Sequence, residues 1–238
     1  MDEVLSCLEA VEDERRQRDA DPGLKNRVEA LKRFQQLRFA HTYRDLLASR
    51  RYGTAARFFL DDLYGPADFR QRDRQFARIV PRIDSVFPVA VSETIHDLAR
   101  LHALSEQLDT AMARCMPNEG LDAASYVNAW LTVGRLGDRG RQLDLVLGIG
   151  HAIERLTRYA WLVMGLKMMR GPARAAGLLE LQQFLERGLA SFRAMGGASD
   201  FLSTIEERER RLIQALFEGD ALALQHDEEL VAIVMPVA

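Results

Sequence analysis

Cysteine is scarce in this sequence. The 238 residues include only Cys7 and Cys115, which lie far apart and outside any CxxC or Cys/His cluster. Disulfide frameworks and structural zinc sites need paired or clustered cysteines, so we expect neither. The acidic, heavily charged N-terminus, MDEVLSCLEAVEDERRQRD, is unlike the basic and then apolar pattern of a signal peptide. We therefore predict a reducing, cytoplasmic location.

The sequence also lacks a large excess of either charge and a long apolar run. The formal net charge is -3 and the pI is about 6.0, so no overall positive charge attracts nucleic acid or anionic membranes. Aromatic residues do not alternate with the short basic runs as base stacking would require. The most apolar run, Tyr159 to Met169, is too short for a span of about 20 residues and contains Lys167. We interpret it as a buried helix segment and expect neither a nucleic-acid nor a membrane partner.

Signatures of the common catalytic and phosphate-binding sites are missing as well. The chain contains no GxSxG, HExxH or Cys-His nucleophile arrangement. The glycine-rich stretch GRLGDRG, residues 134–140, has neither a Lys-Ser/Thr ending nor a preceding strand, so we interpret it as a loop between helices. We expect no cofactor, and the sequence leaves open whether the protein is an enzyme.

What the sequence does have is helical periodicity. Apolar residues recur at intervals of three and four over long segments, whereas sustained period-two alternation is absent outside the apolar C-terminal stretch LVAIVMPVA. This pattern predicts an all-α fold, a bundle of about eight helices. The expected helices cover residues 24–50, 54–64, 68–87, 89–116, 121–133, 141–170, 173–195 and 199–217. We predict one domain over residues 1–238, with subdomains 1–117 and 118–238 as the alternative.

Several helix ends are expected from local chemistry. Asp21, Thr54 and Asp68 each precede an expected helix and have side chains that can accept hydrogen bonds from its free amides. The Gly-Pro pair at 171–172 is expected to end a helix, because proline cannot continue the hydrogen-bond ladder.

The stretch RFFLDDLY, residues 57–64, is expected to be a nearly enclosed helix. Its apolar residues cover most of the circumference, and Arg57, Asp61 and Asp62 share the remaining face. One interpretation is structural: Arg57 pairs with Asp61, and Asp62 takes an arginine from the next helix, which carries Arg70, Arg72, Arg74 and Arg78. The other is functional: Arg57, Asp61, Asp62 and Tyr64 form a ligand pocket, because apolar enclosure shifts carboxylate pKa values as functional sites do.

The segment FFLDDLYGPADFRQRDRQFARIVP, residues 58–81, resembles the signature of the bacterial FFLEELY-motif proteins. Asp61 and Asp62 stand where the family name has two glutamates, which keeps the charge but shortens the reach. The family has no assigned activity, so the resemblance implies no catalytic residue.

One spacing typical of a metal site is present. Helical di-metal carboxylate sites use two Glu-x-x-His pairs, and only Glu93 and His96 fit. The remaining histidines, His41, His102, His151 and His226, have no glutamate three positions earlier. Gly148 and Gly150 precede His151, which makes a haem-type pocket conceivable, although such glycines more often serve helix packing. Glu93 and His96 are therefore weak metal candidates.

Two functions remain. The leading hypothesis is a non-enzymatic helical protein that binds a protein partner or a second copy of itself, through an exposed apolar face or through the stretch VAIVMPVA. The alternative is a helical bundle that binds or transforms a small molecule in a pocket near Asp61, Asp62 and Tyr64.

Overall fold

The fold is all-α, as the periodicity predicts. A computed structural model describes residues 2–63, 69–86, 88–117 and 121–219. Within these ranges there is no strand. The helices are α1 (Asp2–Ala20), α2 (Pro22–Thr42), α3 (Arg44–Ala48), α4 (Gly53–Phe58), the π-helical segment η1 (Phe59–Leu63), α5 (Arg70–Val86), α6 (Val89–Cys115), α7 (Ala123–Val133), α8 (Leu136–Thr157), α9 (Ala160–Met168), α10 (Arg170–Ala175), α11 (Leu179–Met195) and α12 (Ser199–Phe217).

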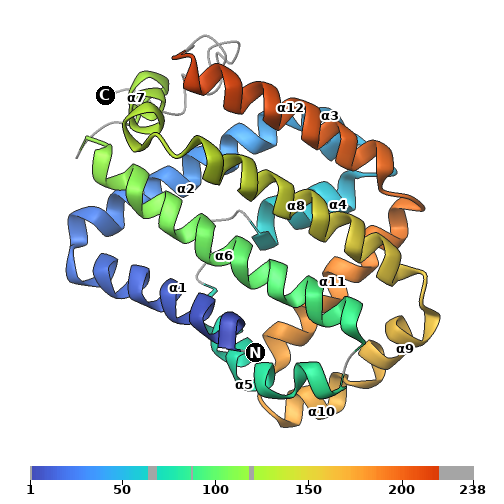
Figure 1. The fold of residues 1–238 in the computed structure, drawn as a ribbon. Helices are drawn as coiled ribbons and strands as arrows, with labels where there is room; N and C mark the ends of the chain where they lie inside the picture. Colours follow the sequence, from blue (N-terminus) through green and yellow to red (C-terminus); the bar gives the residue numbers. More distant parts are fainter. Residues whose placement is uncertain (1, 64–68, 87, 118–120, 220–238) are drawn as a thin grey trace.

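Four long helices form a row. Helix α6 packs between α1 and α8, and α8 packs in turn against α12, so these helices run side by side in Figure 1. Helix α2 contacts α6, while α11 contacts both α4 and α8. The short helices α9 and α10 join α8 to α11 at one edge of the molecule (Figure 1).

The largest core cluster contains the two phenylalanines of the RFFLDDLY stretch. Phe58 lies 5.5 Å from Phe184 between ring centroids, and Phe59 lies 5.7 Å from Phe201. A side-chain Cβ at Gly188 of α11 would stand 2.9 Å from the ring of Phe58, so only glycine allows α11 to approach α4 this closely. The cluster unites residues of α2, α4, α8, α11 and α12. The expected enclosure of Phe58 and Phe59 is therefore confirmed.

The first half of the chain differs from expectation in three places. Residues 2–20 form α1, a helix that was not predicted, and the expected helix over 24–50 breaks at Tyr43. Thr54 is not a cap, since α4 already begins at Gly53. The Asp21 cap is confirmed, because its carboxylate accepts a hydrogen bond of 3.0 Å from the amide of Leu24. The expected cap Asp68 lies outside the described residues.

The second half departs from expectation between α7 and α11. Helix α8 begins at Leu136, inside the stretch predicted as a loop. Asp138 lies in its first turn, where the negative charge of a carboxylate interacts favourably with the helix dipole and stabilises the helix. The expected helix over 141–170 breaks at Arg158 and Tyr159 into α8 and α9. The Gly-Pro pair 171–172 lies within the first turn of α10, where a missing amide costs little, so the predicted stop is wrong. The C-terminal stretch LVAIVMPVA lies outside the described residues.

Candidate functional site

The predicted pocket residues lie at the end of α4 and in η1. The Asp62 carboxylate accepts a hydrogen bond from Arg187 Nε of α11 at 3.1 Å, so its partner is not one of the arginines of α5. Arg72 of α5 instead donates to the backbone carbonyl of Asp62, at 2.9 Å. Arg57 and Asp61 are exposed, and Arg57 donates to the carbonyl oxygen of Leu47 at 3.4 Å. Tyr64 lies outside the described residues. Asp62 thus ties η1 to α11 and α5.

The two weak metal candidates do not come together with enough further ligands to form a metal site in the described chain. Glu93 is exposed on α6, and His96 Nδ1 lies 3.7 Å from a carboxylate oxygen of Glu3. The Glu3 carboxylate also accepts a hydrogen bond from Arg100 Nε at 2.7 Å, so the acid beside His96 is already paired with an arginine. Among the described residues, no three histidine, cysteine, aspartate or glutamate side chains come together as a metal site would require.

His151 does not line an enclosed pocket, because its side chain is exposed on α8. Gly150 serves helix packing instead. A Cβ there would stand 2.6 Å from a methyl carbon of Leu202, so the glycine allows α8 and α12 to pack closely.

A group of buried and half-buried charged side chains, which was not predicted from the sequence, lies among α1, α2, α5 and α6. We call it the ionic cluster, and its members are Arg15, Arg18, Lys32, Asp73, His102, Glu106 and Asp109. Buried charges are tolerated only when they are paired and hydrogen-bonded. The contacts of the two best-connected carboxylates, Asp73 and Glu106, meet this condition.

Asp73 brings α5 against α1 and α6. One of its carboxylate oxygens lies 2.6 Å from Arg15 Nη2 and 2.9 Å from His102 Nε2. Burial by itself would raise the pKa of this carboxyl, but the hydrogen bond from His102 and the positive charges of Arg72 and Arg15 outweigh burial and lower it. Asp73 is therefore an anion that holds three elements together.

Glu106 has the same role between α6, α1 and α2. Its carboxylate accepts from Arg18 and, at 2.7 Å, from Lys32 Nζ, while Arg18 also donates to the hydroxyl of Thr110. Burial would raise the pKa of Glu106, yet Lys32 and Arg18 overcome that effect and lower it to about 2. Asp109, one turn further along, has a raised pKa because its burial outweighs the attraction of Lys32.

The sequence contains a signal for this cluster. In α1, Val4, Leu8 and Val11 are buried on one stripe, and Arg15 and Arg18 continue the same spacing. Helix α6 shows the matching pattern, since Ala99, His102, Glu106, Asp109 and Ala113 also follow one another by three or four residues. On each of these two helices an apolar stripe continues as charged residues, basic on α1 and acidic on α6. Such a pattern predicts buried ion pairs between the two helices.

The ionic cluster predicts acid sensitivity. The pKa of Glu106 in the fold, about 2, lies below the ordinary value of 4.5, so the stabilisation is complete above the ordinary value and is lost as the pH falls toward 2. Asp73 acts in the same direction, whereas the raised pKa of Asp109 acts oppositely. We expect the free energy of unfolding, measured by urea denaturation, to fall between neutral pH and about pH 3 and to fall less steeply in Glu106→Gln. Parallel pH profiles of the two proteins would contradict this role of Glu106.

Helix α9 carries an exposed apolar surface. Three of its residues, Trp161, Met164 and Met168, and the flanking Tyr159 and Met169 are between 51% and 74% exposed. No residue of α9 is buried. Trp161, Met164 and Met168 share one face by their spacing, and we call these three residues the α9 stripe. The interpretation of this run as a buried segment is therefore wrong. Apolar composition favours burial, but α9 lies at the edge of the molecule in Figure 1, and no other helix of the described ranges covers this face.

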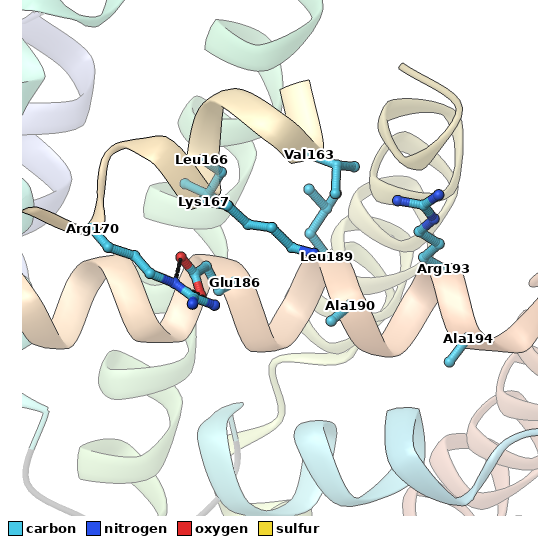
Figure 2. Close-up of a pocket in the computed structure, with 9 residues that line it drawn as sticks. All are labelled: Val163, Leu166, Lys167, Arg170, Glu186, Leu189, Ala190, Arg193 and Ala194. Carbon is cyan, nitrogen blue, oxygen red and sulfur yellow. Dashed lines mark hydrogen bonds and ion pairs between the residues drawn. The ribbon is translucent and has the colours of Figure 1, made fainter. Parts of the chain in front are cut away.

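The other side of α9 borders a cleft against α11. The cleft has a volume of about 400 Å³ and is lined by Val163, Leu166, Lys167, Arg170, Glu186, Leu189, Ala190, Arg193 and Ala194. Figure 2 shows Lys167 reaching from α9 toward α11, and Arg170 bound to Glu186 across the cleft. The α9 stripe and the cleft thus lie on opposite faces of one helix.

Comparison with known proteins gives one match. The sequence profile of a family described as a domain of unknown function (DUF8198) matches residues 14–223. No curated protein and no solved structure matches the chain. In the described part of the chain, no helix has the length and apolar character needed to cross a membrane.

Proposed function

Because the chain belongs to the DUF8198 family of domains of unknown function, we propose its role from its own surface: it is a protein-interaction module that binds a partner on the α9 stripe. The observation that carries the proposal is a helix whose large apolar side chains are exposed while none of its residues is buried. Covering such a surface removes apolar area from water, which favours association. Methionine side chains adapt to the shape of a partner, and tryptophan is a frequent anchor residue.

Charge favours a different protein over a second copy. Residues 155–178 contain five basic side chains and no aspartate or glutamate, although the chain as a whole has a net charge of -3. The basic residues are Arg155, Arg158, Lys167, Arg170 and Arg174. Arg158 and Arg170 pair with Glu154 and Glu186, so the net positive charge comes from the other three. Two copies joined at this surface would bring like charges together, which opposes association. The partner that fits has an apolar groove bordered by acidic residues.

The ligand pocket predicted at Arg57, Asp61, Asp62 and Tyr64 stays a prediction. The Asp62 carboxylate is engaged by Arg187, so the geometry gives less support to this alternative than to the α9 stripe.

Three broader assignments accompany this proposal. The chain is a bacterial FFLEELY-motif protein, which the likeness of residues 58–81 to that signature supports. It is a single domain, which the core shared by α2, α4, α8, α11 and α12 supports. It is cytoplasmic, which the free thiols of Cys7 and Cys115 support.

A photo-crosslinking amino acid at position 168 tests the interaction. Placed there in the full chain within its native cells, it is expected to form an adduct with one other protein, because Met168 is the most exposed member of the α9 stripe. Changing Trp161 to Glu in the same chain should abolish the adduct by placing a charge in the apolar contact. The adduct is measured by its mass on a denaturing gel and identified by mass spectrometry.

The matched control places the same crosslinker at Arg33, an exposed position of α2. Helix α2 lies across the molecule from α9 in Figure 1, so this position should give no such adduct. Equal crosslinking from both positions, or none from position 168, would overturn the proposal. An adduct between two copies of the chain would overturn the choice of a different protein as partner.

A further inference from the structure

The cleft between α9 and α11 has apolar walls on both sides. Val163 and Leu166 line it from α9, and Leu189, Ala190 and Ala194 line it from α11. Figure 2 shows Leu189 pointing toward α9. Its volume of about 400 Å³ lies within the range of small-molecule sites. Apolar walls offer no hydrogen bonds to water, so a ligand with an apolar body would displace water from the cleft with a favourable free energy.

The only acid that lines this cleft is already neutralised. Both carboxylate oxygens of Glu186 accept hydrogen bonds from Arg170 Nε, at 2.7 and 2.8 Å, and Gln182 Nε2 donates to one of them at 2.9 Å. The hydrogen bond from Arg170 lowers the pKa of Glu186, so it stays an anion paired with that arginine. The negative charge of Glu186 is therefore matched mainly by Arg170, and the two together add no net charge to the cleft.

The other cations of the cleft are Lys167 and Arg193. Neither side chain forms an ion pair with a carboxylate in the described part of the chain, and both line the cleft beside its apolar walls. With Arg170 and Glu186 cancelling each other, the cleft carries the positive charge of Lys167 and Arg193. A neutral apolar ligand would leave these two charges unmatched, and a bare inorganic anion would leave the walls uncovered.

We propose that the cleft between α9 and α11 binds a small organic acid, with its carboxylate at Lys167 and Arg193 and its apolar body between Leu166 and Leu189. This site is separate from the α9 stripe, which faces the other way, and from the residues of the RFFLDDLY stretch. A monocarboxylate with a short aliphatic chain combines the charge and the apolar body that the cleft requires.

Titration calorimetry with octanoate and with octan-1-ol tests the proposal on the full chain. The two probes share their aliphatic chain and differ in charge. We expect octanoate to bind about tenfold more tightly than octan-1-ol, because charge-assisted hydrogen bonds to Lys167 and Arg193 are available only to the acid. Replacing both cations, Lys167→Gln with Arg193→Gln, should remove that preference.

Three further variants separate this site from the rest of the surface. Ala190→Trp fills the cleft and should abolish octanoate binding, and Ala190→Leu, a smaller change at the same exposed position, should weaken it. Trp161→Ala, on the α9 stripe, should leave it unchanged. The proposal is overturned if octanoate does not bind, if octan-1-ol binds equally well, or if filling the cleft has no effect. None of these outcomes bears on the adduct expected from position 168.

Discussion

Glu106→Gln is expected to lower the free energy of unfolding by about 3 kcal/mol, because it removes the carboxylate that neutralises the buried Arg18 and the half-buried Lys32. Glu106 is 5% exposed and accepts hydrogen bonds from Arg18 and Lys32. Glutamine has nearly the same size, so the loss reports charge and not a cavity. Urea denaturation at neutral pH, followed by circular dichroism, measures the change.

The control for this variant is Glu207→Gln. Glu207 pairs with Arg211 four residues later on α12, and both side chains are exposed, so solvent screens the pair. Its replacement should change the unfolding free energy by no more than about 0.5 kcal/mol. Similar losses in the two variants would show that the ionic cluster contributes no more than a surface pair.

Phe58→Ala is expected to cost about 4 kcal/mol, in line with large-to-small changes in closely packed cores. Phe58 is 6% exposed and packs against Phe184 and against the backbone at Gly188, where α4 meets α11. The shortened side chain would leave a cavity that these neighbours fill only in part. The midpoint of urea denaturation should move to a lower concentration with little change in slope.

Trp161→Ala is the matched control for Phe58→Ala. It also removes a large aromatic side chain, but Trp161 is 57% exposed on the α9 stripe. We expect a change within about 0.5 kcal/mol, because little packing is lost. A large loss for Trp161→Ala would mean that the stripe serves the fold and not a partner, and a small loss for Phe58→Ala would contradict the place of the RFFLDDLY stretch in the core.

The candidate sites were predictable only in part. The enclosure of Phe58 and Phe59 follows from apolar residues around a whole helix, and it is found. The partner of the Asp62 carboxylate was predicted among the arginines of α5 because they are near in sequence, yet the carboxylate accepts from Arg187 of α11, and Arg72 of α5 donates to the Asp62 backbone carbonyl instead. Proximity along the chain does not decide which helix packs against η1, the segment that carries Asp62.

The sequence by itself determined the all-α class, the positions of most long helices and the Asp21 cap. These depend on interactions within a few residues: apolar periodicity, and hydrogen bonds between a side chain and the nearest amides. The tertiary structure alone decided that the charged stripes of α1 and α6 face each other and that the apolar α9 stripe is exposed among the described residues. Both depend on which helix faces come together, and that is set by packing between segments far apart in the chain.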